Sequence, residues 1–236
     1  MDDSGEQLME KWRWERFFEA FPYIWDGLWV TVQFTVLGSL VAYILGLIFA
    51  MIRRMRIPVV DQLLWAFIEF VRSTPLLVQI FVLYWVVRPE LFGALSIDNQ
   101  RLLVGVLALG VHYACYTAEV YRAGIDAVPA AQWEAATALN LPRARAWTDV
   151  ILPQAIPRVL PALGNYTIGM FKEVPLLSSI VVLDMVYQVK TVYAADTGGA
   201  GPEAWVAVGL TFLALSYPCS ILVRKAQERV GAIEAK

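Results

Sequence analysis

Five stretches of the chain are apolar for long enough to cross a membrane as helices. A spanning helix needs roughly 20 mostly apolar residues, because the hydrocarbon core of a bilayer is about 30 Å thick. The stretches are Gly27–Ile52, Leu63–Val87, Leu102–Tyr121, Pro161 to about Val186, and Ala204–Val223. The fourth is the weakest, since Lys172, Glu173 and Pro175 interrupt it. The pattern predicts an all-α integral membrane protein with about five transmembrane helices.

The composition supports the membrane interpretation and argues against other classes. Hydrophobic residues make up 58% of the 236 residues and charged residues 17%, which is rare in a soluble domain of this length. A net charge of −2 without a basic run predicts no nucleic-acid partner. Cys115 and Cys219 lie in apolar segments and are expected to pack rather than pair. A single histidine excludes an H-E-x-x-H site, and we expect no metal.

Lysine and arginine are distributed unevenly among the connections between the stretches. Connections that face the cytoplasm carry an excess of these residues. Three connections are rich in them: Arg53, Arg54 and Arg56 after the first stretch, Arg122, Arg143, Arg145 and Arg158 after the third, and Arg224, Lys225, Arg229 and Lys236 after the last. The asymmetry predicts an N-terminus outside and a C-terminus in the cytoplasm. Lys11, Arg13 and Arg16 in the N-terminal tail are a mild conflict, offset by acidic neighbours.

Residues 1–22 have a different pattern from the rest of the chain. They lack the apolar core and small-residue cleavage site of a signal peptide. Apolar side chains alternate with charges at roughly helical spacing, at Leu8, Trp12, Phe17, Phe18 and Phe21. We interpret this segment as an amphipathic helix that lies in the membrane–water interface on the outer side of the membrane. The alternative is a flexible tail without fixed structure. Residues 23–236 are predicted to form one transmembrane domain.

Charged residues inside the apolar stretches are the candidate solute path. A charge at the centre of a bilayer costs about 2.5–3.5 kcal/mol on insertion scales, so it usually faces protein or water. The charged positions are Glu69, Arg72, Glu119 and, directly after the third stretch, Arg122, followed by Lys172 and Glu173. The first four form two pairs three residues apart, so ion pairing that fixes helix packing competes with a path role. For Lys172 and Glu173 we favour the path, because Pro175 must bend or break the helix beside them.

Two other residues in these stretches have structural interpretations. Pro75 removes a backbone donor and is expected to kink the second helix near Arg72. His112 stands alone among apolar residues, and we expect a core histidine with a satisfied hydrogen bond rather than a ligand.

The polar segment 134–154 lies between hydrophobic stretches and is patterned like a docking element. Residues 132–139 have helix-forming composition, and Asn140 tolerates the left-handed conformation that ends a helix. Pro142 prevents that helix from continuing. A second helix is expected from Ala144 to Ile151, stopping before Pro153. Two short helices with a fixed turn would make a rigid cytoplasmic protrusion able to transmit force.

The sequence lacks two motifs typical of nucleotide hydrolysis and of nucleophilic catalysis. The sequence contains no G-x-x-x-x-G-K-[ST] phosphate loop and no G-x-S-x-G nucleophile elbow. A membrane protein that has polar residues in its spans but no nucleotide-binding site of its own is a passive conduit, a gradient-driven carrier, or one part of an assembly driven by another subunit.

The polar segment resembles the EAA loop of ABC importer permeases. That pattern reads EAA, three residues, Gly, nine residues, Ile, one residue, Leu-Pro. Here it falls on Glu134-Ala135-Ala136, Asn140 in place of Gly, Val150 in place of Ile, and Leu152-Pro153. We refer to residues 123–158 as the EAA loop.

The resemblance extends over nearly the whole chain, to permeases of the polar amino-acid type. The segment 70–79, FVRSTPLLVQ, is similar to that subfamily's FRGTPLLVQ, and residues 172–177, KEVPLL, stand where it has KDTSLL. Val174 and Pro175 are the departures. Details at His112-Tyr113, residues 117–121, residues 138–140 and Pro175 are similar to permeases for ectoine and hydroxyectoine.

The resemblance implies a type I ABC importer permease of a bacterial inner membrane, with two permease chains as a homodimer or heterodimer. It implies a cytoplasmic ATPase dimer that uses ATP and Mg, an extracytoplasmic solute-binding protein, and no cofactor or enzymatic activity on this chain. The residues expected to couple to the ATPase are Glu134, Ala135, Ala136, Asn140, Leu152 and Pro153. The hypothetical substrate path comprises Arg72, Lys172, Glu173, Glu69 and Glu119. The alternative is a self-sufficient secondary carrier or channel for polar solutes.

Overall fold

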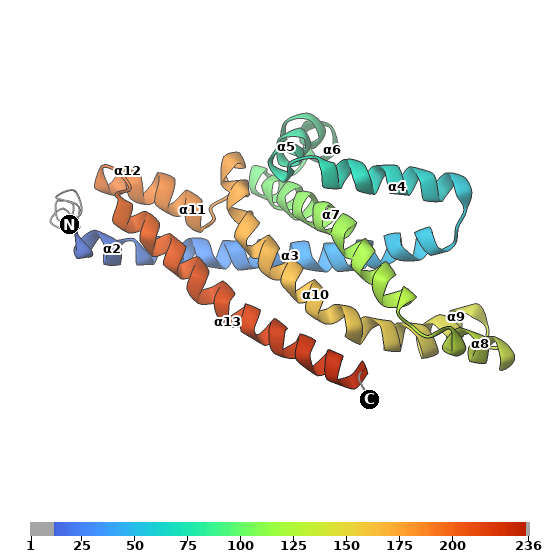
Figure 1. Ribbon diagram of the computed structural model, residues 1–236. Coiled ribbons are helices and arrows are strands. Elements are labelled where there is room, and N and C mark those ends of the chain that lie inside the picture. The colour runs from blue at the N-terminus through green and yellow to red at the C-terminus, as the bar shows by residue number, and fades with distance from the viewer. Residues whose placement is uncertain (1–11, 235–236) are drawn as a thin grey trace.

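The computed structural model describes residues 12–234, and helices make up all of the regular secondary structure in that range (Figure 1). The long helices are α3 (Phe21–Arg54), α4 (Pro58–Ser73), α7 (Ile97–Asp126), α10 (Leu152–Glu173) and α13 (Pro202–Glu234). The short helices are α2 (Trp14–Glu19), α5 (Leu76–Phe81), α6 (Arg88–Phe92), α8 (Ala130–Ala138), α9 (Arg143–Arg145), α11 (Met185–Tyr187) and α12 (Ala194–Thr197). Between them lie the π-helical segments η1 (Val82–Val87), η2 (Ala146–Ile151) and η4 (Gln188–Tyr193), and the 3₁₀ segment η3 (Val174–Ile180). The predicted all-α class is confirmed.

Helices α3 and α7 pack along each other and form the centre of the fold. Small residues permit this close approach, as they do between helices in membranes. Gly46 of α3 lies directly against Thr117 of α7. The Thr117 hydroxyl donates a hydrogen bond of 2.9 Å to the Ala42 carbonyl. Gly110 of α7 makes room in the same way for Val41.

Helix α10 lies against α7 and α3 and connects them to α13 (Figure 1). The Tyr43 hydroxyl of α3 donates to the Leu163 carbonyl of α10 over 2.9 Å. The rings of Phe171 and Phe212, 5.2 Å apart, join α10 to α13. Only 17% of the most apolar window of α13 is buried, against 67% for α7. The exposed apolar surface of α13 is therefore suited to lipid or to another membrane chain.

The N-terminal segment is attached to the end of the molecule that carries α11 and α12 (Figure 1). The Arg13 backbone N–H donates to Glu203 at the start of α13 (3.0 Å), and the Tyr193 hydroxyl donates to the Arg16 carbonyl (3.3 Å). Trp14 and Phe18 of α2 stay exposed. Residues 14–19 are thus helical with apolar groups outside, whereas residues 1–11 of the predicted amphipathic segment lie outside the described residues. The division at residue 22 stays a prediction.

The second apolar stretch is broken rather than kinked. Helix α4 ends at Ser73, Thr74 and Pro75 are extended, and α5 begins at Leu76. Proline disfavours the helical conformation of the residue before it, which explains the extended Thr74. The axes of α4 and of the segment Leu76–Phe92 differ by 107°.

Within residues 12–234 the structure contains three to four candidate spans, against about five predicted. By length and apolar composition they are Trp14–Arg54, Ile97–Asp126 and Pro202–Val230, with the bent pair around Pro75 as a fourth. The predicted bounds of the stretch from Pro161 to about Val186 are wrong. Helix α10 begins at Leu152 and ends at Glu173, and residues 174–197 fold into short segments. Pro157 and Pro161 lie inside α10. Their spacing of four places them on one helix face, so the helix loses donors on one side only.

Gly27 of α3 provides a test of this packing. A Cβ atom there would lie 2.5 Å from the Met185 backbone nitrogen and 2.6 Å from the Asp184 carbonyl carbon. Backbone atoms cannot move aside as a flexible side chain can, so we expect Gly27→Ala to lower stability by about 1–3 kcal/mol. Thermal unfolding of the detergent-solubilised protein measures this. Gly209→Ala on α13, where a Cβ meets nothing within 4 Å, is the matched control and should not lower the melting temperature. Equal melting temperatures for both variants would contradict the close α3–α11 contact.

Candidate functional site

The first arm of the EAA loop ends in a left-handed turn at Asn140, as the sequence predicts. Asn140 has φ +47°. Its backbone N–H donates to the Thr137 carbonyl (2.9 Å), and the Leu141 N–H donates to the Ala136 carbonyl (3.1 Å). These two bonds define a Schellman motif, which satisfies carbonyls that the end of α8 would otherwise leave free. Asparagine therefore serves in the place of the family glycine.

The second arm differs from the prediction that its helix stops before Pro153. Pro142 is extended and precedes α9, after which η2 and α10 continue without a non-helical residue. The Leu152 N–H bonds to the Trp147 carbonyl, five residues back, and so closes the π-type turn. Pro153 is the second residue of α10, directly after this turn, and the chain stays helical across it.

Side chains hold the two arms together and attach them to the spans. The rings of Trp133 and Trp147 meet edge to face with centroids 5.3 Å apart. Gln154 donates to Gln132 over 3.2 Å. The Arg54 guanidinium at the end of α3 lies over Trp133, 4.9 Å from the ring centroid. The loop is therefore a stiff hairpin fixed to α3, not a flexible connection.

Within the second arm, Arg145 and Asp149 form an ion pair one helical turn apart (3.0 Å). The Thr148 hydroxyl and the Arg145 guanidinium hold the pKa of Asp149 below its ordinary range, so this carboxylate is charged at neutral pH.

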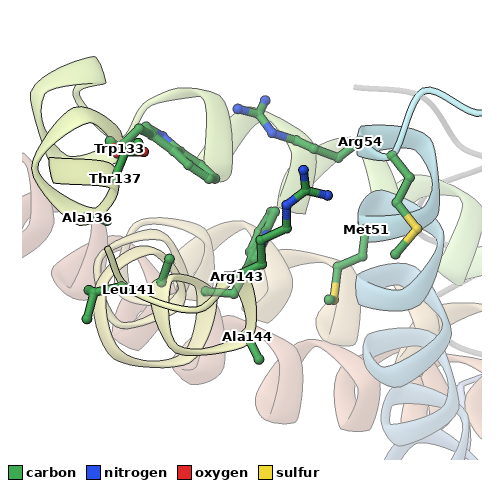
Figure 2. Close-up of a pocket in the computed structure, with 11 residues that line it drawn as sticks. Met51, Arg54, Trp133, Ala136, Thr137, Leu141, Arg143 and Ala144 are labelled. Carbon is green, nitrogen blue, oxygen red and sulfur yellow. The ribbon is translucent and has the colours of Figure 1, made fainter. Parts of the chain in front are cut away.

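A pocket of about 530 Å³ lies between the end of α3 and the EAA loop. Figure 2 shows Arg54 reaching from α3 and Arg143 from α9 into the space between the two elements. The lining residues are Met51, Arg54, Met55, Trp133, Ala136, Thr137, Leu141, Arg143, Ala144, Ala146 and Trp147. Its lining is thus apolar with two cationic groups and no carboxylate.

The predicted coupling residues are not equally accessible. Glu134, Ala135 and Asn140 are exposed on the first arm, and Pro153 is exposed at the start of α10. Leu152 is half-buried, and Ala136 is buried within the loop itself. Coupling to an ATPase stays a prediction for all six, with Ala136 placed to support the loop rather than to form its surface.

A second cluster lies where α4, α7 and α10 meet. Arg72 at the end of α4 pairs with Glu69 over 3.2 Å, which confirms the predicted pairing of these residues. Its guanidinium lies over the Tyr116 ring of α7, 5.2 Å from the centroid. Tyr166 of α10 approaches Tyr116 to 5.9 Å between ring centroids.

Tyr113 extends this cluster to Glu173. Its hydroxyl donates to the Glu173 carboxylate over 3.0 Å, and its ring lies 6.0 Å from Tyr166. The resulting group is a guanidinium and a carboxylate separated by three phenol rings. We did not anticipate Tyr113, Tyr116 and Tyr166 from the sequence, although the three-residue spacing of the first two beside a charged segment was an available signal.

The remaining predicted path residues lie in different surroundings. Glu119 accepts hydrogen bonds from Arg53 of α3 (2.7 Å) and from Arg122 (2.6 Å), which confirms the Glu119–Arg122 pair and supports a role in helix packing. Lys172 is exposed at the end of α10. Contact of Glu119 or Lys172 with a solute stays a prediction.

His112 and the cysteines behave as core and surface residues. The His112 ring is buried and shares a hydrogen bond of 3.0 Å with Gln79, as expected for a satisfied core histidine. Both cysteines are free; Cys115 is buried, as expected, whereas Cys219 is exposed on α13 and not packed as predicted. Among the described residues, no three His, Cys, Asp or Glu side chains gather as a metal ion would require.

Comparison with known proteins decides the family. Residues 21–231 match the family described as binding-protein-dependent transport system inner membrane component. This chain belongs to that family. The chain is therefore a multi-pass inner-membrane component of a binding-protein-dependent transport system. The matched range includes both the EAA loop and the α4–α7–α10 cluster.

Two relatives and one solved structure extend the match. The chain is 44% identical over 203 residues, 86% of this chain and 85% of the relative, to the probable amino-acid ABC transporter permease protein y4tG of Sinorhizobium fredii (strain NBRC 101917 / NGR234). It is 34% identical to protein y4tF of the same strain, another probable amino-acid ABC transporter permease, over 72% of this chain and 74% of that one. A crystal structure of an amino acid ABC transporter with histidines matches with a TM-score of 0.76 and 32% identity, over 90% of this chain and 96% of that chain.

Proposed function

We propose that this protein is the transmembrane permease subunit of an ATP-driven ABC importer for a polar amino acid or an amino-acid-derived solute. The observation that carries the proposal is the stiff EAA hairpin on a chain whose named relatives are amino-acid ABC transporter permeases. A hairpin fixed to α3 and continuous with α10 is suited to receive force from another subunit and pass it to the spans.

The α4–α7–α10 cluster is the proposed solute contact. A zwitterion has a carboxylate and a cationic group, and the cluster presents the guanidinium of Arg72 and the carboxylate of Glu173. Hydrogen bonds in which one partner is charged are shorter and stronger than neutral ones, and the guanidinium and the carboxylate can each form them with a solute. The faces of Tyr116 and Tyr166 also attract a cation.

Ectoine or hydroxyectoine is the narrower substrate proposal. It rests on the resemblance at His112-Tyr113, residues 117–121, residues 138–140 and Pro175. These solutes are cyclic zwitterions, so the same charged groups and ring faces are complementary to them. The names of the relatives y4tG and y4tF specify amino-acid transport without naming a particular amino acid. Polar amino acids therefore remain in the proposal.

The proposed assembly comprises two permease chains, a cytoplasmic ATPase dimer and an extracytoplasmic solute-binding protein. The relatives y4tG and y4tF come from one strain, which supports a pair of different permease chains, with a homodimer as the alternative. ATP and Mg would be used by the ATPase, and this chain would bind no cofactor. The end with α8 and α9 would face the cytoplasm together with the C-terminus, and the N-terminus would lie outside.

The solute proposal is tested with the companion binding protein. We expect its melting temperature to rise with ectoine, hydroxyectoine or one polar amino acid, and the complete assembly in proteoliposomes to import that compound only with ATP. Import by the permease alone down a gradient would instead establish a self-sufficient carrier. Omission of the binding protein and of the ATPase, one at a time, provides the controls.

A further inference from the structure

The break between α4 and α5 leaves backbone carbonyls at the end of α4 without helical partners. The last four carbonyls of any helix lack such partners, and within a membrane each unsatisfied group is costly. The Thr74 hydroxyl reaches back to the Phe70 carbonyl (3.0 Å) and to the Val71 carbonyl (3.2 Å). The Tyr116 hydroxyl donates to the Arg72 carbonyl (3.4 Å).

Gln79 of α5 completes this capping across the break. Its side-chain amide donates to the Val71 carbonyl (2.7 Å), and its nitrogen also lies 2.7 Å from the Thr74 hydroxyl and 3.1 Å from the Thr74 carbonyl. One side chain from the second helix thus bonds the residues on both sides of Arg72 and Ser73. The angle of 107° is held by these contacts as well as by Pro75.

His112 of α7 sets the orientation of that amide. Its Nδ1 lies 3.0 Å from the Gln79 Oε1. Since an amide oxygen only accepts, Nδ1 carries the hydrogen in this arrangement. A donor at this position keeps the oxygen of Gln79 toward α7 and its NH₂ group toward α4. The His112 ring also lies 5.2 Å from Tyr116, the residue on which Arg72 stacks.

We propose that Gln79 and His112 are positioning residues for Arg72: the His112–Gln79 hydrogen bond fixes the bend and thereby holds the guanidinium over the tyrosine cluster. The inference rests on the proposed function, in which Arg72 receives the carboxylate of a zwitterionic solute. Neither residue is required to touch the solute. Their effect on affinity passes through the backbone of residues 71–74.

Two measurements test this pair on the complete permease–ATPase complex in detergent. The first is the Kd for radiolabelled L-glutamine and for radiolabelled ectoine, measured separately without the binding protein. The second is backbone hydrogen exchange of residues 70–80. We expect Gln79→Leu and His112→Phe to raise the Kd about tenfold. Exchange at residues 74–79 should become faster, while basal ATP hydrolysis by the partner subunits stays within about twofold.

Matched variants distinguish a loss of Arg72 positioning from non-specific destabilisation of the protein. His112→Asn retains a donor near the Nδ1 position and should restore both the Kd and the slow exchange. Gln100→Leu removes a buried glutamine that, like the half-buried Gln79, caps a carbonyl, that of Leu95 (2.7 Å), and should change neither. If Gln79→Leu does not insert, Gln79→Glu keeps the shape and replaces the donor by an acceptor.

Three results would overturn the proposal: unchanged exchange in both disruptive variants, faster exchange with an unchanged Kd, or failure of His112→Asn to restore the Kd. If the wild-type complex binds neither probe, Arg72 and Glu173 do not receive L-glutamine or ectoine. Hydrogen exchange then still decides whether the His112–Gln79 pair holds the bend.

Discussion

Replacing Ala135 with arginine is expected to reduce ATP-driven uptake by about 100-fold or more while the protein still inserts into the membrane. Ala135 is exposed on α8, on a hairpin that Trp133 and Trp147 keep stiff. A methyl side chain allows a partner surface to approach the helix closely, and an arginine would hold that surface away. Small misplacements far from the reacting groups can cost about 10²-fold when geometry must be transmitted accurately. Uptake in proteoliposomes and co-purification of the ATPase measure the effect.

Two controls accompany the Ala135 variant. Ala135→Ser changes little volume and should support uptake. Ala226→Arg places the same side chain at an exposed position near the end of α13, outside the EAA loop, and should also support uptake. Wild-type uptake by Ala135→Arg would remove this face of α8 from the ATPase contact.

Replacing Arg72 with lysine is expected to weaken binding of the solute to the permease–ATPase complex by about 10- to 100-fold, since hydrogen bonds to charged groups contribute about 1.5–3 kcal/mol. Lysine keeps the charge but loses the planar fork that matches a carboxylate and the stacking on Tyr116. Equilibrium binding of labelled solute without the binding protein is the measurement, because uptake kinetics also reflect the binding protein.

The chain offers a matched control for Arg72. Arg88 lies over the Tyr84 ring, 4.2 Å from its centroid, outside the tyrosine cluster. Arg88→Lys should leave solute binding unchanged. The double variant Glu69→Gln/Arg72→Gln should bind as weakly as Arg72→Lys or weaker, without leaving Glu69 as an unpaired charge. Equal affinity of wild type and Arg72→Lys would exclude the guanidinium as the carboxylate partner.

Local chemistry was predictable where one residue type determines one conformation. Asn140 had to end α8, because asparagine tolerates the left-handed region and Pro142 blocks continuation. Pairing of Glu69 with Arg72 and of Glu119 with Arg122 could be expected, because residues three apart share a helix face.

Effects that depend on neighbouring helices were not predictable from local pattern. Pro153 was expected to stop a helix, but the chain passes from the π-type turn through Pro153 into α10 without a non-helical residue. Pro75 appeared to kink a span, yet Gln79 and His112 from other helices stabilise a full break. The tyrosine cluster needs the crossing of α7 and α10, which no spacing along one helix specifies.

The helical path from Arg143 to Glu173 has a mechanical consequence. It joins the EAA hairpin to the Glu173 carboxylate beside Tyr113 without a non-helical residue. At 1.5 Å per residue the 22 residues of α10 alone are about 33 Å long, so a tilt of roughly 5° about one end would move the other by about 3 Å. Such a lever arm converts a small rotation at the hairpin into a displacement as wide as a side chain at the far end. The energy source and the solute would then be coupled through one element of the chain.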